Sequence, residues 1–221
     1  MSTAQRYSPR TTCSSTIRIY KRASPCPTPG CDDATVTSTH DWSAGVDAAH
    51  LAAIRRHPGE FAPGGALHLV LEVLAYAADE AVTRCVVTLH PDGSVAVADN
   101  GRGTDTRRDA QGRPVRKPVM ATRDLRYFDH PAAQRLPDGH PRRGVSVVAA
   151  LSEWLVHTNH RHDGAWAQRY EHGLPVTGLE PVPAGGTTGT TVWFRPDRAL
   201  SPVDPAGLTW PGLPVKVVRL P

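Results

Sequence analysis

The chain has no long hydrophobic run, no apolar segment of the secretory-signal kind near its N-terminus and no internal repeat. A membrane-spanning helix needs roughly 20 consecutive apolar residues, and no stretch approaches that length. A secretory signal needs an apolar segment after its basic residues, and the basic N-terminus lacks one. We therefore expect a cytoplasmic protein without a membrane partner.

Cysteine is also scarce, at 4 of 221 residues. Three of them, Cys13, Cys26 and Cys31, lie in a segment rich in Ser, Thr and Pro. Together with His40 they could bind zinc, because four residues separate Cys26 from Cys31. The alternative, which we favour, is that they are free thiols. Cys85 lies in an apolar strand-like run, which predicts a buried and inert thiol.

Composition divides the chain into two parts. Residues 1–40 form a basic arm rich in Ser, Thr and Pro that we expect to be mostly disordered. Residues 41–221 have the length and apolar content of one packed domain. Between residues 102 and 143, eleven Lys and Arg outnumber five Asp and Glu. Such a patch attracts phosphate groups, so DNA is a candidate partner, although many basic patches are merely solvated surface.

The periodicity of apolar residues predicts an alternation of helices and strands after residue 41. Helices are expected at 46–56, 67–82 and 144–155, with a shorter helical piece at 119–125. Strands are expected at 84–90, 94–98, 156–161, 166–172, 190–194 and 215–220. Residues 60–65 are expected to be a loop. The long segment 104–144 has little periodicity, which is typical of a functional or mobile loop.

The helix at 67–82 carries a stripe of polar residues opposite its apolar face. His68, Glu72, Tyr76, Asp79 and Thr83 follow one another at steps of four, four, three and four. This spacing aligns them along one side of the helix. A stripe of this kind is usually the solvent-exposed face, and the spacing alone favours that interpretation.

The stretch ADNGRG, from Ala98 to Gly103, follows the strand at 94–98. A strand that ends in Asp99 holds a carboxylate at the sheet edge. Gly101 and Gly103 have no Cβ, so a ligand could approach the backbone closely there. The alternative is ordinary turn chemistry, since Asp, Asn and Gly are all common turn residues.

Several motifs occur in one order along the chain. They are RRHPGEF (55–61), EVLAYAADEA (72–81), Asp99-x-Gly101-x-Gly103, GVSVVAALS (144–152), YEHG (170–173) and TGT (188–190). This order resembles the ATP-binding domain of the DNA gyrase B subunit and its topoisomerase IV counterpart, within the GHKL (Bergerat) ATPase superfamily. The resemblance covers about residues 46–196, and its motifs together are far more specific than any one of them.

The resemblance implies an α+β fold: a two-layer sandwich of a mixed, mainly antiparallel sheet with helices on one face, and ATP between the layers. It implies that Asp99 accepts a hydrogen bond from the adenine amino group and that Thr190 joins this network. Gly101 and Gly103 would make room beside the base. Glu72 would be the catalytic residue that orients and deprotonates the attacking water. The resemblance also implies a nucleotide-binding role for Arg102, Asp79 and Gly144.

The chain departs from the family pattern at the triphosphate end, so it is a short and degenerate member. Tyr76 stands where the family has an Asn that coordinates Mg²⁺, and a neutral phenol is a poor ligand for that ion, so no metal ligand is expected. Only the end glycines of the phosphate-binding lid survive in the segment 139–144. Arg142 and Arg143 could instead bind phosphate by charge. Ala167 replaces a family arginine.

The transducer domain that follows in the family, with its phosphate-sensing lysine, is not expected in this chain. We therefore expect a protein that binds ATP or another adenine nucleotide with weak or lost hydrolysis and without a firm need for Mg²⁺. One alternative is an active gyrase-B-like ATPase fragment. Another is a non-catalytic paralogue, a nucleotide- or protein-binding regulatory module that pairs with a gyrase subunit or forms a homodimer.

Overall fold

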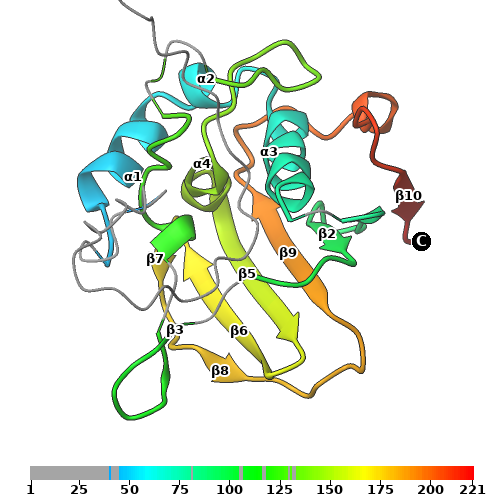
Figure 1. Ribbon diagram of the computed structural model, residues 1–221. Helices are drawn as coiled ribbons and strands as arrows, with labels where there is room; N and C mark the ends of the chain where they lie inside the picture. Colours follow the sequence, from blue (N-terminus) through cyan, green and yellow to red (C-terminus); the bar gives the residue numbers. More distant parts are fainter. Residues whose placement is uncertain are drawn as a thin grey trace, which may run out of the picture. The chain divides into compact units, whose positions relative to one another are not determined.

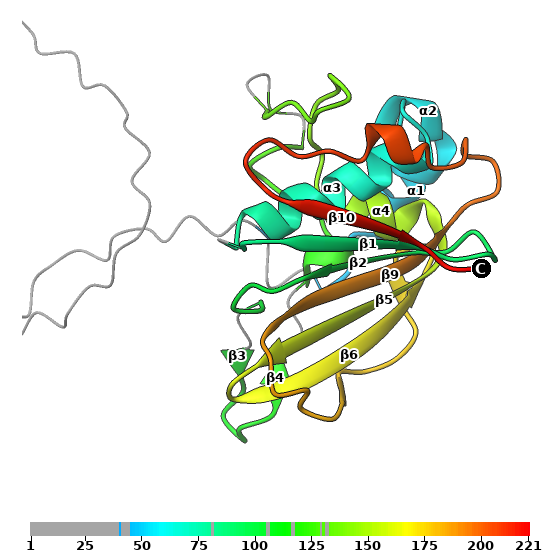
Figure 2. The ribbon, with the colours of Figure 1, turned by 90° about the vertical axis from the view of Figure 1, so that its right-hand side faces the viewer.

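A mixed sheet of eight strands forms one layer of the structure, and helices cover one of its faces (Figures 1 and 2). The computed structural model describes residues 40, 45–80, 82–104, 107–115, 118–128, 130 and 133–221. The N-terminal arm with Cys13, Cys26 and Cys31 lies outside these residues, except for His40. The described residues all belong to one unit, Thr37–Pro221.

The strands of the main sheet run in the order β10-β1-β2-β9-β5-β6-β7, and β8 pairs with β6. They are β1 (Cys85–Leu89), β2 (Val95–Asp99), β5 (Ser152–Arg161), β6 (Gly164–Glu171), β7 (Leu174–Pro175), β8 (Glu180–Pro181), β9 (Gly189–Pro196) and β10 (Val215–Arg219). Among these described strands only the β1–β10 pair is parallel, so the expected mixed, mainly antiparallel sheet is confirmed. A separate hairpin joins β3 (Arg107–Arg108) to β4 (Pro114–Val115).

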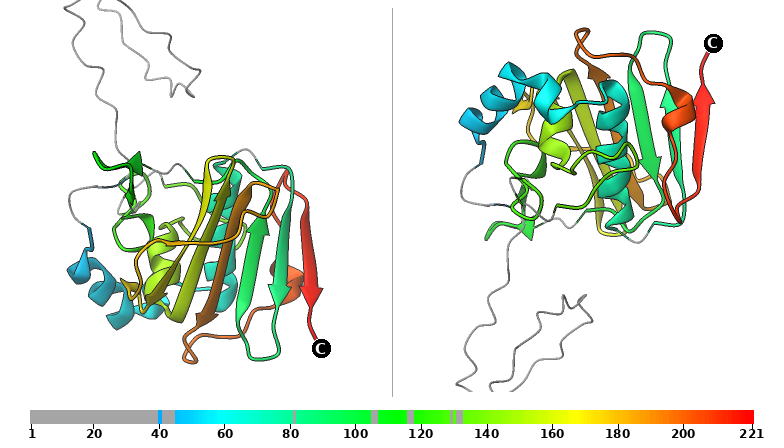
Figure 3. Two further views of the ribbon diagram at one scale, coloured as in Figure 1. Left: turned by 90° about the horizontal axis from the view of Figure 1, so that it is seen from below. Right: turned by 90° about the horizontal axis from the view of Figure 1, so that it is seen from above.

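The helical layer lies on one side of the sheet, as Figure 3 shows from below and from above. Its elements are α1 (Ala48–Arg56), α2 (Pro58–Phe61), α3 (Ala66–Ala78) and α4 (Val145–Ala150), with the 3₁₀ turns η1 (Pro118–Met120) and η2 (Pro205–Gly207). α3 contacts β2 and β9, and α4 contacts β5, β6 and β9. The expected α+β two-layer sandwich is therefore the observed fold.

Local sequence signals explain where several elements begin and end. The Asp47 side chain accepts a hydrogen bond from the His50 backbone N–H at 3.0 Å and so caps the start of α1. The hairpin between β1 and β2 turns at Asp92, whose side chain accepts from the Ser94 N–H at 2.9 Å. Alternate residues of these two strands, such as Val87 and Val97, are buried toward the helices.

The core fills the space between the helices and the sheet. α3 contributes Leu69, Leu71 and Leu74, each with no exposed surface, and the sheet contributes Leu155 and Phe194. Burying side chains of this size stabilises the fold by roughly 1.5–3 kcal/mol each. Cys85 is fully buried as expected, and burial raises the pKa of its thiol to about 12. No helix in the described part of the chain could cross a bilayer.

Four expectations about element boundaries are wrong. The helix expected at 67–82 ends at Ala78, and a short helix, α2, occupies part of the loop expected at 60–65. The helical piece expected at 119–125 is only the turn η1. The helix expected at 144–155 ends at Ala150, and β5 begins at Ser152. The apolar spacing misled here because Leu155 is buried whether it continues a helix or points inward from a strand.

Candidate functional site

Three of the five residues in the polar stripe are buried: His68 and Glu72 have no exposed surface, and Tyr76 is 7% exposed. Asp79 and Thr83, beyond the last residue of α3, are exposed. The expectation of a solvated face is therefore wrong for His68, Glu72 and Tyr76. The reason is that the long segment 104–144 lies against this side of α3 and supplies partners for its polar groups, as the following contacts establish.

Glu72 forms hydrogen bonds with the backbone at the end of residues 139–144, called the lid segment below, just before α4 begins. Its Oε1 accepts from the Arg143 N–H at 2.5 Å, and its Oε2 accepts from the Gly144 N–H at 2.9 Å. Burial raises the pKa of Glu72 to about 7, although the two amide hydrogen bonds oppose this shift. The carboxyl group of Glu72 thus occupies the backbone N–H groups of Arg143 and Gly144, two residues expected to bind nucleotide.

His68 links Glu72 to the start of the lid segment. Its Nδ1 lies 2.6 Å from Oδ2 of Asp138, and its Nε2 lies 3.7 Å from Oε1 of Glu72. Burial is the main reason that the pKa of His68 is lowered, with the Asp138 carboxylate acting against it. A neutral imidazole that donates from Nδ1 to Asp138 fits this geometry.

Arg142 is buried, and both terminal nitrogens of its guanidinium have protein partners, whereas its Nε has no hydrogen-bond partner among the described residues. Only 2% of the residue is exposed. Its guanidinium donates to both carboxylate oxygens of Asp79, at 3.1 and 2.8 Å. It also donates to the Tyr127 hydroxyl at 3.0 Å and to Gln134 at 3.1 Å. Arg142 and Asp79, both expected to bind nucleotide, are here bound to each other.

Tyr76 hydrogen-bonds the segment that follows β2. Its hydroxyl lies 2.5 Å from Oγ1 of Thr104, whose backbone is itself held by the side-chain amide of Asn159. Burial raises the pKa of Tyr76 far above its ordinary value, so the phenol is neutral. A neutral, hydrogen-bonded phenol does not fit Mg²⁺. No group of three or more His, Cys, Asp and Glu in the described ranges could hold a metal ion.

Asp99 lies at the end of β2, next to the start of β9. Its Oδ1 accepts from the Gly101 N–H at 2.8 Å and from the Thr190 N–H at 3.2 Å. Both bonds fall on the same oxygen, so Oδ2 takes no part in them. Asp99 is half-buried, and burial raises the pKa of its carboxyl group. The two residues expected to bind adenine are thus in contact, although 91 positions separate them in sequence.

The glycines of the ADNGRG stretch make room for protein atoms. A Cβ on Gly101 would lie 2.7 Å from the Val82 side chain. A Cβ on Gly103, where φ is +76°, would lie 2.5 Å from the backbone oxygen of His160 in β5. The packing of neighbouring segments therefore requires these glycines, and the expectation that they make room beside a ligand stays a prediction. Arg102 points to Glu80, with Nε 2.9 Å from Oε2.

A cavity of about 200 Å³ lies beside the hydrogen-bonded side chains of Tyr76, Asp79 and Arg142. It is lined by His40, Tyr76, Asp79, Glu80, Val119, Asp124, Arg126, Arg142, Gly144 and Val145. Asp99 and Thr190 are not among the lining residues. Pockets for small molecules usually enclose about 300–1,000 Å³, so this volume suits a part of ATP and not the whole molecule.

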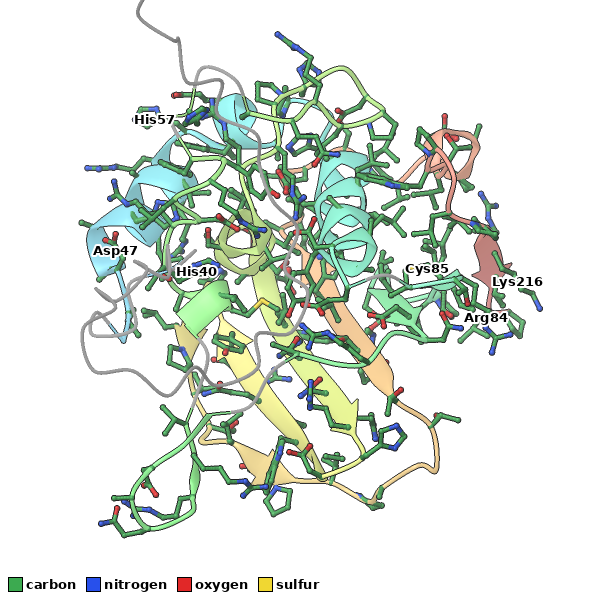
Figure 4. The ribbon with its side chains drawn as sticks, in the orientation of Figure 1. His40, Asp47, His57, Arg84, Cys85 and Lys216 are labelled. Atoms are coloured by element: carbon green, nitrogen blue, oxygen red, sulfur yellow. The ribbon has the colours of Figure 1, made fainter. Side chains whose placement is uncertain are left out.

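His40, considered above as a zinc ligand, is labelled beside η1 in Figure 4, and its Nδ1 lies 3.1 Å from the Thr122 hydroxyl. Thr122, Asp124 and Arg126 carry no signal in the sequence. Asp124 holds Arg126 by two hydrogen bonds, at 3.0 and 2.7 Å. These residues fall in irregular segments, where no periodicity or motif distinguishes a buried polar residue from an exposed one. Cys85 and Lys216, also labelled in Figure 4, lie away from the site on β1 and β10.

Comparison with known proteins finds relatives among the B subunits of DNA gyrase and topoisomerase 4. The topoisomerase 4 B subunit of Staphylococcus epidermidis is 34% identical over 159 residues, which are 68% of this chain and 24% of that protein. The gyrase B subunit of Thermotoga maritima is 38% identical over 156 residues, 66% of this chain and 24% of that protein. The chain belongs to the DNA gyrase B and topoisomerase IV B family. The gyrase B subunit of Archaeoglobus fulgidus is 37% identical over 162 residues, 68% of this chain and 26% of that protein.

This gyrase-B-type chain spans about a quarter of the length of the relatives it matches. No family model matches it. Its sequence-derived site residues fall into two groups. Asp99, Gly101 and Thr190 meet at the ends of β2 and β9. The other group gathers around the lid segment and consists of Glu72, Tyr76, Asp79, Arg142, Arg143 and Gly144.

Proposed function

We propose that this gyrase-B-type domain binds adenine nucleotide and hydrolyses ATP weakly or not at all. The observation that carries the proposal is the contact between Asp99 and Thr190, together with the family to which the chain belongs. A carboxylate held by two backbone amides has a fixed direction, and its second oxygen can accept a hydrogen bond from an amino group.

Weak hydrolysis follows from the groups around the lid segment. Tyr76 is a neutral phenol, and Arg142 is paired with Asp79. Glu72 accepts two backbone N–H groups, so it is not placed to take a proton from water. Removing one group that stabilises charge in a transition state typically costs about 2.7–4 kcal/mol. The loss of several such groups together would suppress turnover almost completely.

Calorimetric titration with ATP and ADP, with and without Mg²⁺, tests this proposal. We expect binding that does not need the metal and that weakens at least about tenfold in Asp99→Asn, because the carboxylate acceptor is lost. Asp163→Asn is the matched control, since Asp163 lies in the exposed turn between β5 and β6. Absence of nucleotide binding at millimolar concentration would refute the proposal. Steady ATP hydrolysis that disappears in Glu72→Gln would refute the loss of activity.

DNA binding is a second candidate function, supported by the β3–β4 hairpin. The hairpin extends from the body in Figure 1 and carries Arg108 and Arg113, both exposed. Arg108 donates to the backbone oxygens of Gly112 and Asp163, and Arg113 pairs with Asp109 at the surface, so both guanidinium groups lie at the exposed hairpin, unlike the buried Arg142. A mobility-shift assay with duplex DNA tests this function. If the chain binds DNA in this way, the DNA band shifts, the shift weakens as the salt concentration rises, and the Arg108→Ala/Arg113→Ala double variant shifts less DNA than the wild type.

A further inference from the structure

The N–H groups at the end of the lid segment already have an anionic partner in this chain. Glu72 has no exposed surface, and its two oxygens take the N–H groups of Arg143 and Gly144. A phosphate group could reach these donors only by displacing the carboxylate. Because that carboxyl group lies on α3 within the core, its displacement would leave a buried polar group without these two hydrogen bonds.

The cations near the cavity are also occupied. Arg142 is hydrogen-bonded to Asp79, and Arg126 is hydrogen-bonded to Asp124. Both carboxylates line the cavity, and Glu80 adds a third. Glu80 in turn pairs with Arg102, whose Nε lies 2.9 Å from Oε2. Each of these three guanidinium groups therefore already has a carboxylate partner, and a triphosphate in the cavity would have to compete with that carboxylate.

We infer that Glu72 is a specificity-determining residue that makes ligand binding independent of phosphate. This inference rests on the proposed function, because it concerns the same site. The adenine and ribose contribute the affinity, and the phosphates remain outside the network of hydrogen bonds around α4. The ligand class is a purine nucleoside with few phosphates or none, and ATP binds only through its nucleoside part.

The test compares adenosine, AMP and ATP as ligands of the full chain, by calorimetry without Mg²⁺. We expect their dissociation constants to agree within about threefold. In Glu72→Ala the two N–H groups lose their partner, and we expect the affinity for ATP relative to adenosine to rise about tenfold or more. Glu60→Gln is the control, since Glu60 is exposed on α2. The ratio of the ATP and adenosine affinities in this variant should equal that of the wild type.

A second readout follows the two N–H groups directly. In ¹H–¹⁵N spectra of the wild-type chain, the amide signals of Arg143 and Gly144 should move equally little with ATP and with adenosine. Glu72→Gln keeps the shape of the side chain and removes its charge, so it replaces Glu72→Ala if thermal melting finds the latter unfolded. Either variant should allow ATP, and not adenosine, to move the Gly144 signal.

The outcomes separate this inference from the proposed function. If neither adenosine nor ATP binds, the proposed function fails and this inference falls with it. If ATP binds more than about tenfold tighter than adenosine to the wild type, the inference fails and the proposed function stands. If the folded Glu72 variants keep the wild-type ratio, the specificity does not depend on Glu72 and the inference fails.

Discussion

Arg142 and Asp79 form a pair with two hydrogen bonds that ties the lid segment to the C-terminal end of α3. Nη1 lies 3.1 Å from Oδ1, and Nη2 lies 2.8 Å from Oδ2. The Arg142 side chain is 3% exposed and the Asp79 side chain is 29% exposed. The guanidinium also lies over the Tyr127 ring, with Cζ 4.1 Å from the ring centroid. An arginine buried to this extent depends on its carboxylate partner.

We predict that Asp79→Asn destabilises the protein by about 3 kcal/mol, because it leaves the Arg142 guanidinium buried without its counter-ion. Unfolding in urea measures this loss. The control is Asp109→Asn, since Asp109 pairs with Arg113 at the surface, where an ion pair contributes little to stability. Equal losses in the two variants would contradict the prediction.

Gly103 and Gly112 form a matched pair for a second prediction. Their φ values are +76° and +77°, so alanine meets similar backbone strain at both positions, about 1–2 kcal/mol. A Cβ on Gly103 would also lie 2.5 Å from the His160 backbone oxygen, whereas nothing lies within 4 Å at Gly112. We therefore expect Gly103→Ala to lower the free energy of unfolding by about 2 kcal/mol more than Gly112→Ala. Similar melting temperatures for the two variants would contradict this packing.

The hydrogen bond between Tyr76 and Thr104 leads to a third prediction. Tyr76→Phe removes the hydroxyl and leaves the buried Thr104 hydroxyl without that partner, so we expect a loss of about 1 kcal/mol. A double-mutant cycle with Thr104→Val should give a coupling energy of about 1 kcal/mol, because the two groups form one bond. Additive losses in the cycle would contradict the interaction.

The sequence predicted those parts of the fold that depend on neighbouring residues. The helix expected at 46–56 and the strands expected at 84–90 and 94–98 are found as α1, β1 and β2, and their ends are set by the neighbouring side chains of Asp47 and Asp92. The prediction that His68 and Glu72 are exposed was wrong because their hydrogen-bond partners come from distant positions in the sequence. Asp138 reaches His68 across 70 residues, and Gly144 reaches Glu72 across 72 residues.

The candidate site also has contacts that the sequence predicted and contacts that it did not. Motif order placed Asp99 and Thr190 in one network, and the structure brings them into contact. The spacing of residues within α3 could not reveal that Glu72 is bonded to the lid backbone and Asp79 to Arg142. Those contacts depend on how an irregular segment packs, and neither composition nor periodicity encodes that packing.

The buried carboxyl group of Glu72 makes the stability depend on pH. Burial raises its pKa from 4.5 to about 7, so between these values the folded protein holds a proton that the unfolded chain has released. The stabilisation from this proton is complete below about pH 4.5 and disappears as the pH rises through 7. Burial lowers the pKa of neighbouring His68, whose effect on stability therefore has the opposite sign.

We predict that Glu72→Gln removes this dependence, because the amide does not titrate. Relative to the variant, the wild-type free energy of unfolding should fall by about 3 kcal/mol between pH 4.5 and 7. Urea unfolding of both proteins at several pH values measures the difference. Glu60→Gln changes an exposed carboxylate and should keep the wild-type profile. A wild-type curve parallel to that of Glu72→Gln would mean that Glu72 titrates as it does in the unfolded chain.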